Sequence, residues 1–248
     1  MTAKRIIYKI RRRFFASLRF AQNDRQIQKK TGFTLAEVLL VITVIGVVAS
    51  LTIPNLISSV QKKQYASGFK EANRLISEVT TNIKEDNGGT LVGAFATATD
   101  MRDKYKTYLS TIKQCPPTGC VNNIVWITLA GEPKAWLSDL NTQSSVYLIN
   151  GMIFQFSRQY TNCDGTSWGY CGYVMVDVNG LKPPNQLGRD VFRMLIAKDG
   201  AWPDGSQRST YQYTGGVTCN PTAPIALCGS YCGIGCGARI MIEGEMNY

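Results

Sequence analysis

One uncharged run constrains this chain more than any other feature of its sequence. The run begins at Val38 and ends at Gln61, and none of its 24 residues carries a formal charge. As a helix with a rise of about 1.5 Å per residue it would be about 36 Å long, against about 30 Å for the hydrocarbon core of a bilayer. The run is therefore long enough to cross a membrane as a single helix.

The segment in front of this run is strongly basic. Residues 1–32 contain ten Lys or Arg and the single acid Asp24, a net charge of +9. The net charge of the whole chain is +10, so the remaining 216 residues carry only +1. Because basic flanks are retained on the cytoplasmic side of a membrane, we expect the N-terminus inside and the bulk of the chain outside.

A short motif, GFTLAE at residues 32–37, joins the basic segment to the uncharged run. Its last residue, Glu37, places a carboxylate at the edge of the membrane run, which costs several kcal/mol unless the group is paired or neutralised. One interpretation is that Glu37 has a partner and a function. The other is that Glu37 lies at the level of the lipid headgroups and has no role.

The motif, with its basic leader and the apolar helix that follows, resembles the processing site of type IV prepilins and type II secretion pseudopilins. The resemblance covers residues 29–89. It implies that a membrane prepilin peptidase cuts between Gly32 and Phe33 and methylates the new amine of Phe33. It also implies that Glu37 pairs with the N-terminal amine of a neighbouring subunit during assembly. Pro54, which should kink the helix by removing an amide donor, falls where many pilins have a proline.

The resemblance implies a cleaved leader at residues 1–32. It also implies a subunit that polymerises through its N-terminal helix into a type IV pilus or a type II secretion pseudopilus. The subunit could be a minor or priming subunit of that filament. The implied partners are prepilin peptidase, the inner-membrane assembly platform, other pilin or pseudopilin subunits and, before assembly, membrane lipid. The chain would cross the bacterial inner membrane once, with its N-terminus in the cytoplasm, and then join an extracytoplasmic filament. No nucleic-acid partner is expected, because the basic charge leaves with the leader.

Two other interpretations of the run stay open. A secretory signal peptide would have an apolar core of about 7 to 15 residues that ends at a small-residue cleavage site, for which Ala49-Ser50 is a weak match. A membrane-anchored extracellular binding or enzymatic domain would use the same helix without polymerising. We expect no enzyme, because the chain has no histidine, which removes the commonest general base and the usual Ser-His and Cys-His pairs.

Beyond Pro54 the sequence becomes amphipathic, and the first turn signal is Asn87-Gly88-Gly89. Apolar residues recur three or four positions apart, which places them on one side of a helix: Phe69, Ala72, Ile76, Val79 and Ile83. The pattern predicts one long helix over residues 33–86. Residues 33–61 would form the membrane and filament core, and residues 62–86 an amphipathic spine of the outer domain.

Residues 87–248 are predicted to form a β-rich globular domain. Apart from a short helix near residues 100–109, segments rich in β-branched and aromatic residues predict strands, at residues 123–129, 146–156, 172–178 and 238–242. Asn150-Gly151 divides the second of these into a hairpin with a type I′ turn. The expected fold is α+β and pilin-like: a long N-terminal helix packed on an antiparallel sheet, with a disulfide-rich C-terminal region.

All eight cysteines lie in this outer domain, at Cys115, Cys120, Cys163, Cys171, Cys219, Cys228, Cys232 and Cys236. An even number of cysteines outside the cytoplasm predicts disulfides, although the sequence does not choose among the connectivities. We expect near neighbours to pair, Cys115 with Cys120, Cys163 with Cys171, and the last four among themselves. A zinc site formed by the last four is the alternative, without histidine and without paired C-x-x-C spacings.

One polar loop carries oxygen ligands of the kind that calcium takes, from Asp177, Asn179 and Asp190. Some pseudopilins hold calcium in a loop of their outer domain, and the resemblance extends that role to this loop. The same residues are also typical of a turn-rich connection that binds no cofactor, in which Asp and Asn bond their own backbone. The full EF-hand spacing is absent, and both interpretations stay open.

Overall fold

The computed structural model describes residues 32–116, 121, 124–134, 137, 140, 143–166, 169–209, 218–222 and 225–248. The predicted leader, up to Thr31, lies outside the described residues. The chain divides into two compact units, Met1–Ile53 and Pro54–Tyr248.

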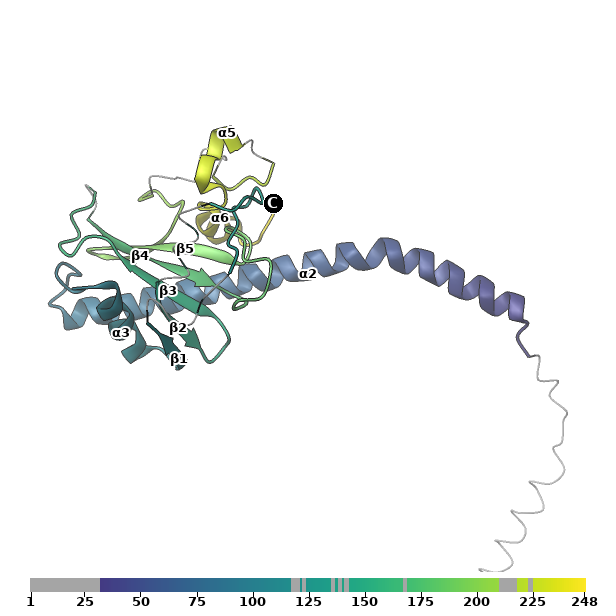
Figure 1. Cartoon of the computed structure of the whole chain (residues 1–248), viewed down its shortest axis with the longest axis horizontal. Coiled ribbons are helices and arrows are strands. Elements are labelled where there is room, and N and C mark those ends of the chain that lie inside the picture. The colour runs from purple at the N-terminus through teal and green to yellow at the C-terminus, as the bar shows by residue number, and fades with distance from the viewer. Residues whose placement is uncertain are drawn as a thin grey trace, which may run out of the picture. The chain divides into compact units, whose positions relative to one another are not determined.

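The longest element is helix α2 (Leu35–Asp86), and Figure 1 shows the part of it that belongs to the second unit passing behind the sheet. Its predicted apolar stripe is buried there, because the stripe packs against the sheet: Phe69, Ala72, Ile76, Val79 and Ile83. Tyr65, Ala66 and Thr80 extend the same buried face. The long helix expected from the sequence is therefore confirmed.

Two glycines end α2. Gly88 and Gly89 both have positive φ, and the Gly89 N–H donates to the Lys84 carbonyl at 2.8 Å. Glycine adopts this backbone conformation without the steric penalty of a Cβ atom. Its N–H can therefore bond to a carbonyl of the last helical turn while the chain leaves the helix.

A six-stranded antiparallel sheet forms the centre of the second unit, with the strands in sequence order from edge to edge. The strands are β1 (Thr111–Cys115), β2 (Ser144–Leu148), β3 (Ile153–Arg158), β4 (Tyr170–Asp177), β5 (Val191–Ala197) and β6 (Gly200–Pro203). Each strand pairs with the next along the chain, so short connections suffice. The helix on an antiparallel sheet confirms the predicted α+β class.

Helices α2 and α3 (Ala98–Tyr108) cover one face of this sheet. The rings of Phe69 and Phe192 lie 4.5 Å apart, and those of Tyr105 and Phe156 lie 5.1 Å apart. Tyr105 is fully buried, and its hydroxyl hydrogen-bonds Thr80 of α2 at 2.5 Å. Aromatic contacts thus fix α2 to the sheet of the second unit, Pro54–Tyr248, hereafter the outer unit.

A smaller core lies on the opposite face of the sheet. In β4, Val174 and Val176 belong to the α2 side, whereas Met175 between them belongs to the second core. This alternation is the period of two that a strand imposes. The second core also contains Val121, Trp126, Leu137, Leu140, Leu187, Val191 and Ile234.

The predicted hairpin between β2 and β3 is confirmed, but the predicted type I′ turn is wrong. A type I′ turn needs positive φ at both central residues. Gly151 has φ 87°, whereas Asn150 is not among the positive-φ residues. The loop instead closes through the Gly151 N–H to the Leu148 carbonyl and the Leu148 N–H to the Met152 carbonyl, at 3.0 and 2.9 Å. It is one residue longer than a type I′ loop, with glycine in the left-handed position.

Two predicted strands are wrong. Residues 238–242 form part of helix α6 (Cys236–Glu243), which follows α5 (Ile225–Cys228) and a 3-10 turn (Gly229–Tyr231). A five-residue apolar run does not distinguish strand from helix. Within 123–129, the described residues make only isolated bridges, through Ile127.

We expect Phe69→Ala to lower the free energy of unfolding of the outer unit by about 3–5 kcal/mol, because it empties a fully buried ring site. Chemical denaturation of the full chain in detergent, followed by near-ultraviolet circular dichroism, measures this change. Ser67→Ala, at an exposed position of the same helix, is the matched control and should shift the value by less than about 0.5 kcal/mol. Equal effects of the two variants would contradict the assigned packing.

Candidate functional site

The first turn of α2 is closed by reciprocal hydrogen bonds between Thr34 and Glu37. The Thr34 hydroxyl accepts the Glu37 N–H at 3.2 Å, and Glu37 Oε2 accepts the N–H and the O–H of Thr34 at 2.8 and 2.9 Å. This capping box satisfies backbone donors that the start of a helix leaves unpaired. Thr34 is thus a site residue that was not predicted, although its T-x-x-E spacing to Glu37 is the signature of such a box.

The predicted cleavage site lies immediately before this cap. Gly32 and Phe33 are outside the helix, and the Phe33 side chain is 86% exposed. A Cβ atom added at Gly32 would meet no atom within 4 Å. Proteolysis favours exposed backbone outside regular structure, and Gly32 and Phe33 meet both conditions.

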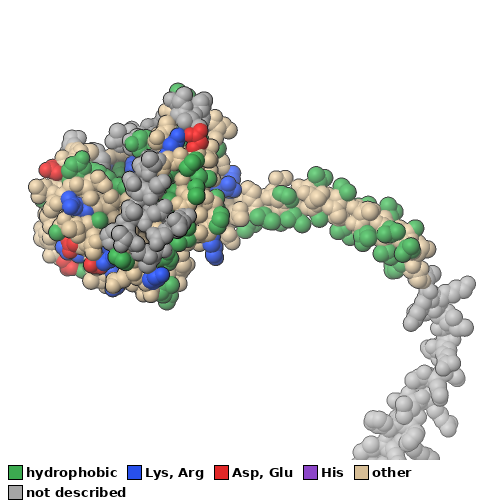
Figure 2. Space-filling model, in the orientation of Figure 1, with side chains coloured by type: hydrophobic (Ala, Val, Ile, Leu, Met, Phe, Trp, Pro, Cys, Tyr) green, Lys and Arg blue, Asp and Glu red, His purple; other side chains and the backbone are tan. Residues whose placement is uncertain are grey.

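The first half of α2 exposes a continuous apolar surface, shown by the green side chains along the helix in Figure 2. The large hydrophobic side chains between Leu35 and Val60 are 44% to 80% exposed. Among the described residues, α2 is the helix that is long and apolar enough to cross a membrane, with a mean hydropathy of 2.4 over 18 residues, none of them buried. Such a surface requires lipid or other apolar helices as its environment.

Several hydroxyl groups within this apolar surface bond to the helix itself. Thr43, Ser50 and Thr52 donate to carbonyls three or four residues earlier, at 2.8, 2.8 and 2.9 Å. In lipid an unsatisfied polar group costs several kcal/mol, so internal bonding suits a lipid-facing helix. Pro54 lies inside α2, and the helix continues on both sides of it.

Disulfides join near neighbours in the outer unit, in the pattern expected: Cys163–Cys171, Cys219–Cys236 and Cys228–Cys232. Cys115 is also disulfide-bonded, and its predicted partner Cys120 lies outside the described residues. The four cysteines of the zinc alternative all form disulfides, so that alternative is wrong, because a zinc ligand must be a free thiolate.

The structure brings the three predicted calcium ligands together beside α2. Asp177 ends β4 and pairs in register with Val191, the residue after Asp190. The Asn179 side-chain amide contacts the hydroxyl of Tyr65 on α2 at 3.5 Å. Asp177 and Asp190 are 2% and 0% exposed. Two carboxyl groups thus share a buried site at the join between the sheet and α2.

Hydrogen bonds satisfy both oxygens of Asp190 but only one oxygen of Asp177. The two oxygens of Asp190 accept the N–H groups of Asn185 and Gln186 at 2.9 and 2.7 Å. Asp177 Oδ1 accepts the Asn179 N–H at 3.2 Å, while Asp177 Oδ2 is buried without a partner. The side-chain oxygens of Asn179 and Asn185 are also buried and unpaired. Unpaired buried oxygens are costly, which points to a bound proton or cation.

Burial raises the pKa of both carboxyl groups. Desolvation, followed by repulsion from Asp190, raises the pKa of Asp177 from its ordinary value of 3.8 to about 9, against the N–H groups of Asn179 and Gly180, which lower it. Desolvation also raises the pKa of Asp190, against the N–H groups of Gln186 and Asn185, which lower it. Two close carboxyl groups in a buried site do not both ionise unless a cation balances them.

Asn185 was not predicted as a member of this site. It lies eight residues beyond Asp177, after Pro183-Pro184. The hydrogen bond from its backbone N–H to Asp190 places it in the site. Among the described residues, no group of three or more His, Cys, Asp or Glu side chains is placed to hold a metal ion. A cation here would depend on two carboxyl groups and on amide oxygens.

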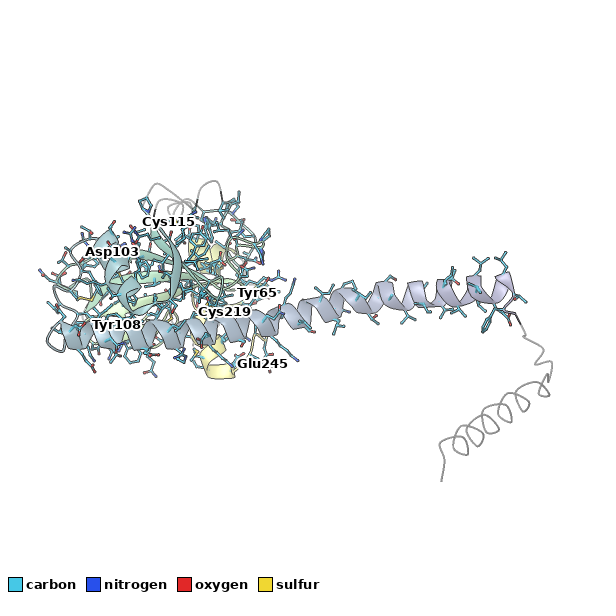
Figure 3. The ribbon with its side chains drawn as sticks, turned by 90° about the horizontal axis from the view of Figure 1, so that it is seen from below. Tyr65, Asp103, Tyr108, Cys115, Cys219 and Glu245 are labelled. Carbon is cyan, nitrogen blue, oxygen red and sulfur yellow. A yellow bond between two sulfur atoms is a disulfide. The ribbon has the colours of Figure 1, made fainter. Side chains whose placement is uncertain are left out.

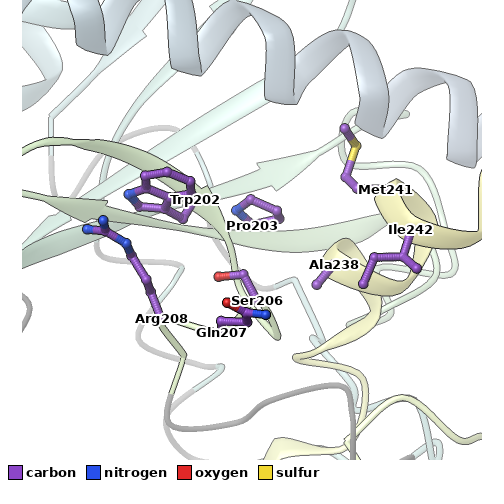
Figure 4. A pocket seen from close by; sticks show the side chains of 8 residues that line it. All are labelled: Trp202, Pro203, Ser206, Gln207, Arg208, Ala238, Met241 and Ile242. Atoms are coloured by element: carbon purple, nitrogen blue, oxygen red, sulfur yellow. The ribbon is translucent and has the colours of Figure 1, made fainter.

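A separate cavity of about 440 Å³ lies between β6 and α6 (Figure 4). Its lining residues are Trp202, Pro203, Ser206, Gln207, Arg208, Ala238, Met241 and Ile242. Arg208 lies over the Trp202 ring at 4.5 Å and pairs with Asp199 at 2.6 Å. The cavity suits an apolar group. Its lining residues contain no carboxylate or other general base beside the Ser206 hydroxyl.

Comparison with known families identifies the segment that contains the capped helix start. Residues 27–53 match the family model described as the prokaryotic N-terminal methylation motif. No curated protein and no solved structure matches the chain. The chain therefore carries a prepilin-type processing signal. That signal is the one of type IV pilins and pseudopilins, and it supports a type IV pilin-like, membrane-anchored protein that prepilin peptidase processes.

We expect the stability of the outer unit to fall as pH rises between about 4 and about 9. Asp177 holds a proton in the folded state with a pKa of about 9, whereas the unfolded chain releases it near 3.8, so folding is favoured at low pH. Thermal unfolding of the full chain across this pH range, without divalent cations, measures the slope. Asp177→Asn should flatten the slope, and an unchanged slope would contradict the raised pKa.

Proposed function

We propose that this chain is a structural subunit that polymerises through its N-terminal helix into a type IV pilus or a type II secretion pseudopilus. One observation carries the proposal: the matched methylation motif leads into an exposed apolar helix, and the same helix continues as the buried spine of the outer unit. An element of this kind connects a membrane or filament core directly to a globular domain.

Polymerisation would cover the exposed apolar surface of α2. In the bilayer, lipid covers it. In a filament, the same side chains would pack against the helices of neighbouring subunits, which removes the apolar area from water without a lipid. We propose that Glu37 then pairs with the amine of Phe33 on a neighbouring subunit, after cleavage has created that amine.

Within this class, the chain fits a minor or priming subunit. Its outer unit is large, and at least seven of its cysteines form disulfides. An apolar cavity also lies on its surface, which suits contact with a different partner. The alternative, a membrane-anchored extracellular domain that does not polymerise, uses the same helix but gives Glu37 no role beyond the cap.

We expect Glu37→Ala to insert in the membrane but to fail to enter filaments. The variant loses both the carboxylate and the helix cap, so Glu37→Gln is the matched control. Glutamine keeps the capping acceptor but not the charge. If assembly requires the charge, both variants are absent from sheared filaments while both resist alkaline extraction from membranes.

Recovery of filaments by Glu37→Gln would contradict pairing with an amine and leave the cap as the only role. Normal function of Glu37→Ala would favour the anchored domain. Gly32→Val serves as the processing control, and it should leave uncleaved precursor in the membrane fraction of the same strain.

We propose calcium as a second role for the outer unit, at the buried cluster of Asp177, Asn179, Asn185 and Asp190. The observation that favours it is the set of buried oxygens without hydrogen-bond partners, on Asp177, Asn179 and Asn185. Calcium takes carboxylate and carboxamide oxygens in flexible geometry. It would also balance the two carboxylates that otherwise repel each other.

Calcium should raise the melting temperature of the full chain, since a ligand in 100-fold excess over Kd stabilises the folded state by about 2.7 kcal/mol. Differential scanning calorimetry with calcium, and with magnesium for comparison, measures the shift. Asp190→Asn and Asn179→Ala should reduce it, whereas Asp103→Asn, outside the cluster, should not. No shift for the wild-type chain would overturn the calcium role and leave a bound proton.

A further inference from the structure

Four cations surround the turn of α2 that follows the uncharged run. Lys62 and Lys63 are the two residues after the run, with Lys63 exposed and Lys62 half-buried. Lys182 is exposed and Arg189 is half-buried, on the loop between β4 and β5. Figure 2 shows Lys and Arg side chains on both sides of α2 where it enters the outer unit.

Contacts place this loop against the same turn of α2. Asn179 bridges the Tyr65 hydroxyl and the Pro183 carbonyl, at 3.5 Å each, and Pro183 follows Lys182. A Cβ atom at Gly68 would lie 3.1 Å from Val178 Cβ, so the helix and the start of the loop are in close contact.

The C-terminal segment joins the loop to the helix from another side. Lys62 donates to the main-chain oxygen of Tyr248. The Tyr248 hydroxyl donates in turn to the Gly188 carbonyl at 2.6 Å, next to Arg189. The four cations therefore belong to one surface that α2, the loop and the C-terminal segment form together.

No carboxylate side chain in the part of the chain that the structure describes forms an ion pair with these four cations, and Lys62 is held by the main-chain oxygen of Tyr248. Among the described residues, none of the ion pairs involves Lys62, Lys63, Lys182 or Arg189. Asp177 and Asp190, at the two ends of the loop, are buried. Glu245 is the exposed acid of the C-terminal segment. The surface thus keeps a net positive charge.

Such a charge is unexpected on the translocated side of a membrane helix. Basic residues close to a membrane span favour the cytoplasmic side, and these cations oppose the orientation that the leader imposes. They also begin at the residue after a 24-residue uncharged run, which is longer as a helix than the hydrocarbon core by about 6 Å. Lys62 and Lys63 therefore reach the headgroup region when the run spans the bilayer.

We propose that the surface of Lys62, Lys63, Lys182 and Arg189 binds the phosphate groups of anionic lipids and docks the outer unit on the bilayer before assembly. This inference rests on the proposed membrane insertion and adds a ligand class to it. Each Lys or Arg near an anionic surface contributes about 1 kcal/mol, and salt screens the attraction. The lipid contact holds the loop between β4 and β5 in place and is released when the subunit leaves the membrane.

The test uses the full chain in nanodiscs of phosphatidylcholine alone, or with a third of that lipid replaced by phosphatidylglycerol. Hydrogen exchange of the backbone amides between Asn179 and Asp190, read by mass spectrometry, reports docking of the loop. We expect slower exchange in the anionic discs and loss of the difference at high salt. Lys63→Glu and Lys182→Glu should each lower the protection of these amides by anionic lipid at least about fivefold, the equivalent of the about 1 kcal/mol that one lysine contributes.

Lys198→Glu is the matched control. Lys198 is also exposed, but its carbonyl bonds Leu91, and the adjacent Asp199 carbonyl accepts from Lys84, 22 residues or about 33 Å along α2 from Lys62. Figure 3 shows the two ends of this part of α2 through Tyr65, on α2 itself, and Tyr108 of α3, whose hydroxyl bonds Asp86 at the end of α2. Lys198→Glu should keep the lipid dependence.

Resistance to alkaline extraction scores membrane insertion separately. A chain that inserts, but whose loop exchanges equally in both kinds of disc, overturns the lipid-binding surface and leaves the proposed function standing. Equal losses in Lys198→Glu and Lys63→Glu also overturn it, because they show an effect of total charge. If alkali extracts the chain from the membrane, the membrane insertion on which both proposals rest is refuted.

Discussion

The structure depends on the exposed apolar surface of the first half of α2, for which the described residues offer no cover. Beyond Pro54 the same helix buries a stripe that includes Phe69 and Ile76 against the sheet. One half therefore gains its stability from protein packing and the other requires an apolar environment outside the subunit. A helix divided in this way connects lipid, or a filament core, to a domain in water.

The polar groups around this apolar surface follow from the same constraint. Thr34 and Glu37 satisfy the start of the helix, and hydroxyls such as Thr43 bond to carbonyls of their own helix. At the other end of the run, Lys62 and Lys63 mark the return to the aqueous side. No side chain between Glu37 and Lys62 carries a charge. Charged residues therefore mark both ends of the membrane segment.

Sequence patterns predicted the parts of the fold that long periodicity or special residues determine. The stripe from Phe69 to Ile83 was correct because it repeats over several turns, and Asn150-Gly151 located a hairpin although its turn type was wrong. Residues 238–242 were mistaken for a strand, because five apolar residues fit either structure until Cys236 is tied to Cys219 and the helix docks on α2. Contacts distant in sequence decided that case.

The candidate site divides in the same way. The processing motif is local, so its residues could be predicted, and Thr34 was within reach of the T-x-x-E rule. Asn185 and the basic surface with Arg189 depend on how a loop folds against α2, which no local pattern encodes. Mass spectrometry of the N-terminal peptide, on chain isolated from its native membrane, measures whether the chain is processed at Gly32. A processed chain begins at N-methylated Phe33, and a chain that retains residues 1–32, or begins after Ala49, would contradict the prepilin-type processing.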